Sequence, residues 1–364
     1  MSAVLAIACA LAGILGSASC KRRKPAIWTR AWLGPQHACS LQKTGALQCW
    51  GANEAGQLGD RTTTPHALPA PVVNGGRPDD VALGAHHTCA LAGGTVKCWG
   101  DGSHGQLGTG LTTPLSAPTL PPLWHGAPLA GVTAIAAGGD QTCALAEDAV
   151  RCWGIGRVEP TAVQGLEHAA PPLAVGLQHV CAALTQPKAV RCSGSDDHGQ
   201  SAGQNPILAG ATIIGLTAGA KHTCALLEDG SVQCWGANDS GQLGDGTTLD
   251  SRVPALVSAL PPALEIRAGA THTCARLRTN TVACWGGNAE HQLANGTSKP
   301  SGKPQPVPGL TGVLELAVAG DSACARLSEG DVRCWGANGA GQLGDGTTDP
   351  HTVPMPIRTP PPPR

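Results

Sequence analysis

The sequence predicts an all-β protein, a seven-bladed β-propeller of about four-stranded antiparallel blades with one disulfide in each blade. Three observations predict this fold: a segment repeats seven times, each copy holds a cysteine pair around a turn, and each copy supplies about four short strands. The copies start 50, 54, 38, 43, 50 and 50 residues apart, at Cys39, Cys89, Cys143, Cys181, Cys224, Cys274 and Cys324. A period of about 20–50 residues indicates a repeat architecture, and four short strands per repeat fit a closed propeller.

Each copy is expected to begin with a short apolar strand that ends five residues before its first cysteine. That position holds Gly34, Gly84, Gly138, Gly176, Gly219, Gly269 and, in the last copy, Ala319. Two strands then carry the cysteines. Trp-Gly, a Gly-Gln-Leu-Gly loop and a Pro/Val strand such as residues 253–257 follow. The propeller is therefore predicted over residues 28–358.

Turn formers stand midway between the two cysteines of each copy, which are 9, 10 or 11 positions apart. Where the spacing is ten, the turn ends in Gly or Asn, as a three-residue hairpin requires at its left-handed last position. The cysteines should then face each other on antiparallel strands, within reach of a disulfide. The predicted pairs are Cys39–Cys49, Cys89–Cys98, Cys143–Cys152, Cys181–Cys192, Cys224–Cys234, Cys274–Cys284 and Cys324–Cys334. Zinc is disfavoured, because its cysteine knuckles are more closely spaced.

The composition indicates small cores and no nucleic-acid surface. The 364 residues include no Phe or Tyr and nine Trp, so Ala, Val, Leu and Trp must fill the blades. Such a core buries little area per residue, which makes the cross-links important for stability. The net charge of −1 argues against nucleic-acid binding, which normally needs an excess of Lys and Arg.

Residues 1–20 are predicted to be an export signal with a lipobox-like end. The apolar run 2–19 ends in small residues, and lipidation is expected at Cys20. Residues 21–27 would form a short basic tether and residues 359–364 a Pro-rich tail. The rival interpretation is an uncleaved anchor, because the basic cluster follows the apolar run, where positive charge resists export. Fourteen of the 16 cysteines fall in the predicted pairs, which is typical of an oxidising compartment.

Histidines and tryptophans recur at fixed repeat positions, which favours a structural role. The histidines are His37, His87, His179, His222 and His272, two residues before a first cysteine. A metal-binding ring of histidines is the alternative, but packing residues obey repeat symmetry whereas functional sites break it. Hydrogen bonding to backbone at blade junctions is therefore expected. The tryptophans should be the large packing groups, with each indole N–H bonded nearby; they are Trp50, Trp99, Trp153, Trp235, Trp285 and Trp335.

The polar loops do not match a known phosphate or calcium motif. No Lys follows the loop glycines, and residues 245–248 lack the carboxylates of an EF-hand. Turns with left-handed glycines and threonine hydroxyls are expected instead. No catalytic signature is found, so no cofactor is expected and the protein is predicted not to be an enzyme.

Departures from the repeat are the best guide to a binding surface. Unit three stops after Trp153-Gly154, and unit four has Ser193 in place of Trp. A tryptophan outside the repeat position, together with the changed loop of unit four, suggests partner-binding residues, namely Trp124, His125, Asp196, Asp197 and His198. The alternative is that Trp124 covers the side of the ring where the blades are small.

The run from His222 to Gly244, HTCALLEDGSVQCWGANDSGQLG, resembles the repeat of the regulator of chromosome condensation family. The resemblance covers roughly residues 28–358 and implies a seven-bladed β-propeller. The family's eukaryotic founder activates a small GTPase on chromatin. That activity is not expected here, because fold alone does not transmit function.

The expected function is therefore a non-enzymatic scaffold that binds a protein partner through its loop faces. The ring is expected to be monomeric and exported, either as a membrane-anchored lipoprotein of a bacterial cell envelope or as a secreted protein. One alternative is a secreted enzyme inhibitor of propeller type. A lyase or hydrolase built on one propeller face is the other.

Overall fold

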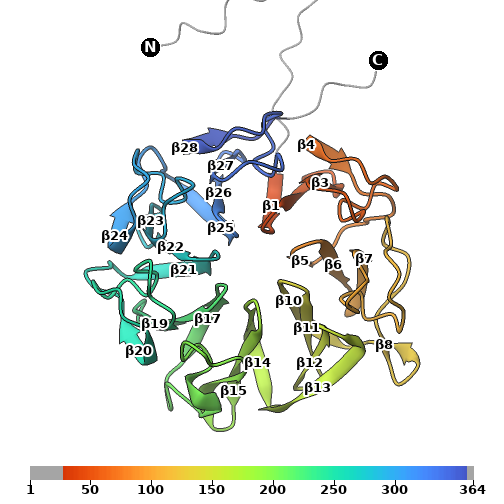
Figure 1. Ribbon diagram of the computed structural model, residues 1–364, viewed down its shortest axis with the longest axis horizontal. Coiled ribbons are helices and arrows are strands. Elements are labelled where there is room, and N and C mark those ends of the chain that lie inside the picture. Colours follow the sequence, from red (N-terminus) through yellow and green to blue (C-terminus); the bar gives the residue numbers. More distant parts are fainter. Residues whose placement is uncertain (1–27, 359–364) are drawn as a thin grey trace, which may run out of the picture.

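The computed structural model describes residues 28–358, which form seven antiparallel sheets arranged as blades around a central channel (Figure 1). The seven-bladed propeller and its intra-blade disulfides are thus confirmed. The chain completes each blade before it begins the next. No helix within residues 28–358 is long and apolar enough to cross a membrane. The predicted signal, lipidation site, tether and tail fall at residues 1–27 and 359–364, outside the described residues.

The two inner strands of every blade are an apolar channel-lining strand and the strand with the first cysteine. The channel-lining strands are β1 (Trp28–Leu33), β5 (Asp80–Leu83), β10 (Val132–Gly138), β14 (Ala169–Val175), β17 (Ile213–Ala218), β21 (Ala263–Ala268) and β25 (Val313–Ala319). The second strands are β2 (His37–Gln42), β6 (His87–Ala92), β11 (Gln141–Ala146), β15 (His179–Thr185), β18 (His222–Leu227), β22 (His272–Leu277) and β26 (Ser322–Leu327).

The third strands carry the second cysteine, and the outer strands complete five of the blades. The third strands are β3 (Leu47–Gly51), β7 (Thr95–Gly100), β12 (Ala149–Gly154), β16 (Lys188–Gly194), β19 (Val232–Gly236), β23 (Val282–Gly286) and β27 (Val332–Gly336). The outer strands are β4 (His66–Pro71), β13 (Arg157–Glu167), β20 (Ser251–Leu256), β24 (Ser301–Pro306) and β28 (His351–Pro356).

Blades 2 and 4 have three strands, because their outer strand is reduced to a single bridge. Gly100 pairs with Leu115 in blade 2, and Val190 pairs with Ile207 in blade 4. A short hairpin, β8 (Leu123–Trp124) and β9 (Ala127–Pro128), follows blade 2, and the 3-10 helix η1 (Ala202–Gln204) follows β16. The blades are numbered here by their channel strands, so that β1 begins blade 1 and β25 begins blade 7.

The disulfides join directly facing residues of the second and third strands in every blade. All seven predicted pairs form, with Cα atoms 4.0–4.1 Å apart. This register follows from the hairpin turns, in which Gly45, Gly230, Asn280 and Gly330 adopt positive φ as predicted. In the chain-entropy model each loop of about ten residues contributes roughly 2–3 kcal/mol.

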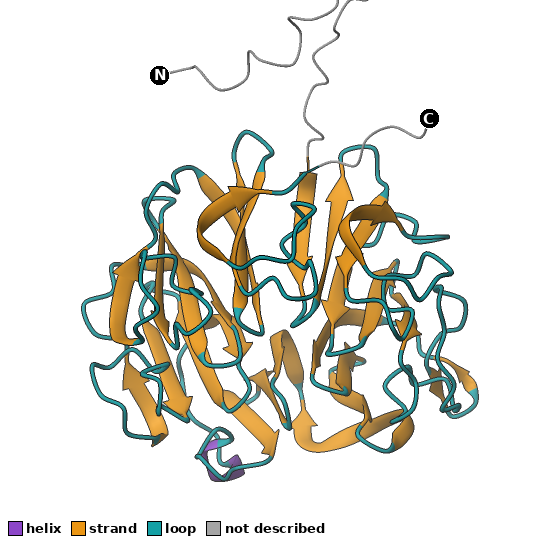
Figure 2. Ribbon diagram, turned by 45° about the horizontal axis from the view of Figure 1, so that its top comes forward, coloured by secondary structure: helices purple, strands orange, loops and turns teal. Residues whose placement is uncertain are grey.

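The apolar cores lie between blades, because each cluster combines residues from two neighbours. Between blades 5 and 6, Val232 and Leu243 pack with Ala275 and Trp285. The six repeat tryptophans are each at most 1% exposed. The blades therefore support one another sideways, and the tilted view in Figure 2 shows the sheets standing side by side around the ring.

Within residues 28–358, the first and last blades of the ring share no strand. Blade 1 consists of β1–β4 and blade 7 of β25–β28, and these two blades lie side by side (Figure 1). Contacts between them include Trp28 N to Gly330 O (3.2 Å), Gly346 N to Ala67 O (2.9 Å), and an ion pair from Arg30 Nε to Glu315 Oε1 (3.2 Å). Closure therefore depends on packing and lateral hydrogen bonds.

Candidate functional site

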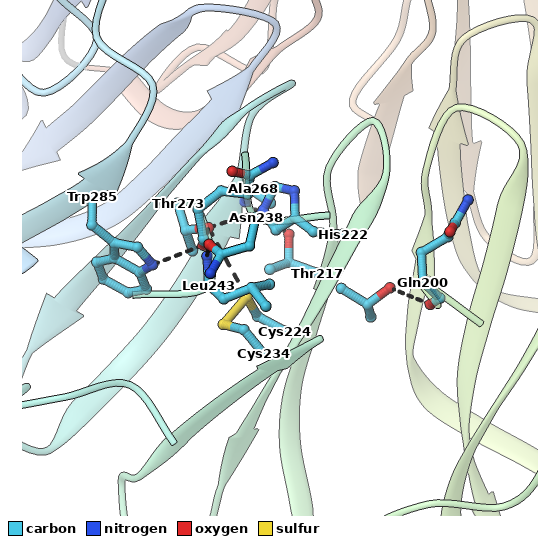
Figure 3. The surroundings of a disulfide bond; sticks show 12 residues. Gln200, Thr217, His222, Cys224, Cys234, Asn238, Leu243, Ala268, Thr273 and Trp285 are labelled. Carbon is cyan, nitrogen blue, oxygen red and sulfur yellow. Dashed lines mark hydrogen bonds between the residues drawn. A yellow bond between two sulfur atoms is a disulfide. The ribbon is translucent and has the colours of Figure 1, made fainter. Parts of the chain in front are cut away.

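At six of the seven junctions, a glutamine carbonyl joins the loop of a blade to the tryptophan of the next blade. Trp285 Nε1 donates to Gln242 O at 2.9 Å, beside the Cys224–Cys234 disulfide (Figure 3). The same bond links five further pairs, namely Trp50–Gln342, Trp99–Gln57, Trp153–Gln106, Trp235–Gln200 and Trp335–Gln292. The expected bond of each indole N–H is therefore present, and its acceptor is backbone of the adjacent blade.

The repeat histidines bind threonine hydroxyls of the following blade, and not backbone as expected. His222 Nε2 lies 3.0 Å from Thr273 Oγ1, and that hydroxyl donates to Gln242 O at 3.1 Å. Equivalent contacts of 2.6–2.9 Å are His37–Thr88, His87–Thr142 and His179–Thr223. Because each threonine proton goes to a glutamine carbonyl, Nε2 carries the proton of the histidine in this arrangement.

His272 is the exception, because Ala323 stands where the next threonine would be. The ring is fully buried, and neither Nδ1 nor Nε2 has a hydrogen-bond partner among the described residues. At the junction of blades 3 and 4 the two positions hold Gln141 and Val180, and at the junction of blades 7 and 1 they hold Ser322 and Ala38. The other junctions without a threonine therefore also lack a histidine. Histidine and threonine therefore occur together at four junctions and are separated only at the junction of blades 6 and 7.

Burial keeps all five histidines neutral near pH 7. Desolvation lowers the pKa of His37, His222 and His272 to about 3, and that of His87 and His179 to about 4. A second proton on any of these rings would place a charged imidazolium inside an apolar junction. Within residues 28–358 no group of three or more His, Cys, Asp or Glu is placed to hold a metal ion.

The glycine at the end of the channel strand makes room for the histidine ring. A Cβ on Gly84, Gly176, Gly219 or Gly269 would lie 2.0–2.2 Å from Cε1 of the histidine three residues later. The last copy has Ala319, and the corresponding side chain there is the smaller Ser322. The one missing glycine thus coincides with a missing histidine.

The departures in units three and four form one structural change. Blade 3 lacks the loop whose glutamine carbonyl would accept an indole N–H, and blade 4 has Ser193 in place of the donor tryptophan. Blade 4 also has Val180 at the position of the threonine that would bind the same carbonyl. Because the acceptor and both donors are lost together, none of these three groups is left without its partner.

The polar loops are held by an asparagine that follows Trp-Gly. Asn238 Oδ1 accepts a bond from Leu243 N at 3.0 Å, and Nδ2 donates to Asp245 Oδ1 and to Thr247 O, each at 3.2 Å. In blade 4 Asp196 takes this place and accepts from Ser201 N at 2.9 Å. These contacts make the loops a structural part of the blade.

Trp124 and His125 lie at the hairpin after blade 2, where Trp124 is half-buried against the core of blades 2 and 3. The guanidinium of Arg151 lies 4.7 Å from the centroid of the indole, and the His125 ring meets it edge-on at 4.3 Å. The tryptophan therefore covers part of blade 3 and keeps a solvent-accessible edge.

Asp196, Asp197 and His198 belong to the junction of blades 4 and 5. Arg252 Nη1 lies 2.9 Å from Asp196 Oδ2, and His198 Nδ1 lies 2.8 Å from Asp250 Oδ2. Asp197 Oδ2 accepts from the hydroxyl of Ser195 at 3.1 Å. No bond or ring contact between described residues joins this group to Trp124.

Charged residues of blades 6 and 7 beside the mouth of the channel were not predicted from the sequence as site residues. Arg276 pairs with Glu265 at 3.2 Å, and Arg326 pairs with Glu315 at 2.9 Å. A sequence signal exists, because the position two residues after the first cysteine is Leu in four copies, Ala in one and Arg only in the last two.

The family model for the regulator of chromosome condensation (RCC1) repeat matches residues 44–91, 93–145, 229–276 and 329–363. A second model of this repeat matches residues 79–106, 213–242 and 265–292. The solved structure of Prp20p from Saccharomyces cerevisiae superimposes with a TM-score of 0.73 at 19% identity, covering 92% of this chain and 88% of Prp20p. At this identity the similarity supports the fold alone.

Two relatives share higher sequence identity over parts of the chain. The human E3 ubiquitin-protein ligase HERC2 is 32% identical over an alignment 252 residues long, which covers 62% of this chain and 5% of HERC2. The ultraviolet-B receptor UVR8 of Arabidopsis thaliana is 32% identical over an alignment 157 residues long, which covers 36% of each protein. The chain thus spans only a small part of HERC2. Because the two repeat models together match more than half of its residues, the chain belongs to the RCC1 repeat family.

Proposed function

We propose that this protein is an exported, non-enzymatic propeller that binds another protein through its faces. The observation that carries the proposal is the use of the repeat histidines within the ring. His37, His87, His179 and His222 bond to threonines of neighbouring blades and are fully or almost fully buried. Chemistry by these groups would require opening a junction, whereas the two faces and the rim are free for contacts.

The known partners of a related fold agree with a binding role. Prp20p is described by its binding to Gsp1p and histones. The seven disulfides suit an oxidising, extracellular compartment. We therefore place the proposed partner outside the cytosol.

The proposed attachment to the membrane is through Cys20. Residues 1–20 would direct export, and lipid on the cysteine would hold the ring at the cell envelope through the short basic tether. A Cys20→Ala variant should move the protein from the membrane fraction to the soluble fraction, with incorporation of a labelled fatty acid lost. Fatty-acid labelling that persists in this variant would contradict the proposed site.

The proposed binding role is tested by capture of partners from envelope extracts with the native ring. We propose Trp124 and His125, and separately residues 196–198, as partner contacts, because they break the repeat pattern and keep accessible edges. Substitution of Trp124 by Ala should weaken capture while the disulfides stay intact. Absence of any specific partner for the folded ring would argue against the scaffold.

A combined replacement of His87, His222 and His272 separates the scaffold from an enzyme. The scaffold predicts a loss of stability, because three buried junctions change. A folded triple variant that lost a catalytic rate would instead favour the enzyme.

A further inference from the structure

A groove crosses the face of blades 5, 6 and 7 beside the mouth of the central channel. Its aliphatic rim comes from one repeat position, where Ile214, Leu264 and Leu314 are 50%, 43% and 43% exposed. The groove has a volume of about 360 Å³ and shares Ile214, Arg267 and Glu315 with the lining of the channel. The corresponding positions in blades 1 and 3 are Thr29 and Thr133. Blades 5, 6 and 7 therefore present branched aliphatic side chains where blades 1 and 3 present threonine.

The base of the groove breaks the repeat at a position that is normally buried leucine. Blades 1, 2, 3 and 5 place Leu41, Leu91, Leu145 and Leu226 there, all at most 5% exposed. Blades 6 and 7 place Arg276 and Arg326 there, with side chains 17% and 19% exposed. Partly buried charge is costly to retain without a compensating role.

The arginines have hydrogen-bond donors left over, and both oxygens of each neighbouring carboxylate already accept a bond. Glu315 accepts from Arg30 through Oε1 and from Arg326 through Oε2. Glu265 accepts from Arg267 through Oε1, and from Arg276 and Leu316 N through Oε2.

Arg326 donates only from Nε among the described residues, and Arg276 makes no contact there through Nη2. A guanidinium carries five N–H groups. With three arginines and two glutamates in its lining, the groove has one positive charge in excess, and it has arginine N–H donors that no described residue accepts.

We propose that this groove binds a short segment of a protein partner in which an acidic residue is flanked by aliphatic residues. The acidic carboxylate would accept N–H donors from Arg276 and Arg326, and its aliphatic neighbours would contact Ile214, Leu264 and Leu314. This inference rests on the proposed function and names the surface that carries it. Charge complementarity selects the acidic residue, and the exposed rim selects its apolar neighbours.

If the arginines served only as cross-strand partners of Glu265 and Glu315, replacing them would change stability and not binding. Replacing both arginines by Leu restores the residue of the other blades, and each glutamate keeps a second cationic partner, Arg267 or Arg30. The Arg276→Leu, Arg326→Leu variant should therefore fold. Its loss of binding would separate recognition from stability.

The probe is a fluorescein-labelled heptapeptide, Gly-Leu-Asp-Leu-Asp-Leu-Gly, with control peptides carrying Lys for Asp or Ser for Leu. Fluorescence anisotropy is measured with the wild-type ring, with R276L/R326L, and with R278Q as the matched control. Arg278 is exposed in the turn that follows β22 and donates to Asp229 O of blade 5, outside the groove. A second variant, L264S/L314S, tests the rim, with L249S as its control on an exposed outer loop.

We expect the acidic peptide to bind the wild-type ring and the control variants R278Q and L249S with the same affinity. Its affinity for R276L/R326L should be at least about tenfold lower. The affinity for L264S/L314S should be about threefold lower or more. Higher salt should lower the affinity of the wild-type ring for the acidic peptide. Equal binding by all variants, or no preference over the Lys peptide, would refute the groove. Arginine-dependent binding to phosphatidylglycerol vesicles without peptide binding would overturn it in favour of a lipid surface.

Partner capture distinguishes failure of this inference from failure of the proposed function. A partner captured equally by the wild-type ring and a folded R276L/R326L variant would leave the scaffold standing and refute the groove. A folded wild-type ring that captures no partner would count against the scaffold, and the groove would then be refuted if the peptide also failed to bind.

Discussion

Replacing Ala323 by Thr should repair the junction of blades 6 and 7. His272 is fully buried there with both ring nitrogens unpaired among the described residues, whereas the four equivalent histidines each contact a threonine hydroxyl. The new hydroxyl would accept from His272 Nε2 and donate to Gln292 O, which now accepts the indole N–H of Trp335. Four junctions already accommodate this threonine, so the local backbone has room for it.

Two hydrogen bonds contribute a net of about 1 kcal/mol each, and crowding by the added atoms offsets part of this gain. We expect the free energy of unfolding to rise by about 1–2 kcal/mol. With a urea m-value of roughly 3 kcal/mol/M, the midpoint should move up by about 0.3–0.7 M. Urea titration with the disulfides intact, followed by tryptophan fluorescence, measures this shift.

The matched control is Ala38→Thr at the junction of blades 7 and 1. Its hydroxyl would face Gln342 O, but Ser322 replaces the histidine there and already donates to Ala337 O. Ala38→Thr should therefore gain less. If Ala323→Thr did no better than this control, or kept its gain when His272 was also replaced by Ala, the histidine–threonine bond would not be the cause.

Three further outcomes follow from the same junctions and cross-links. Stability should fall as the pH drops from about 6.5 towards 4, because the buried histidines have pKa values of about 3–4 when folded and bind protons near 6.5 when unfolded. Each histidine contributes about 1.4 kcal/mol per pH unit to this loss of stability in that window. His222→Gln should therefore make the urea midpoint less dependent on pH. An unchanged slope would contradict the role assigned to this histidine. Replacing Cys274 and Cys284 together by Ala should lower the free energy of unfolding by about 2–3 kcal/mol, and a midpoint equal to wild type would show that packing alone holds the blade. Gly269→Ala should cost about 1–3 kcal/mol, because its Cβ would lie 2.2 Å from His272 Cε1, whereas Ala319→Gly should change the melting temperature little.

The repeat and the cysteine spacing were sufficient to predict the blades, because local turn chemistry determines which residues face each other. Gly230 at the left-handed end of its turn places Cys224 opposite Cys234, and the neighbouring copies follow the same rule. No comparable local rule predicts which blade lies next to a given side chain. The contact of His222 with Thr273 spans 51 residues, and only the closed ring brings them together.

The groove could not be predicted because its residues look unremarkable within single copies. A single copy gives no sign that an Arg two residues after its cysteine is unusual, and the departure of Arg276 and Arg326 from buried leucine appears only when the copies are aligned by position. Trp124 and Asp196, which were predicted as partner-binding residues, lie on other blades and make separate contacts, with Arg151 and Arg252. The accessible rim of Ile214, Leu264 and Leu314 depends on the channel geometry.

Because every blade is built from one uninterrupted stretch of chain, no strand within residues 28–358 ties the first blade to the last. New termini placed in any connection between blades, with the old ends linked, would leave each sheet and each cross-link whole. Permuted versions of the gene should therefore yield the same wheel. Units of about fifty residues could likewise be gained or lost without leaving a strand orphaned.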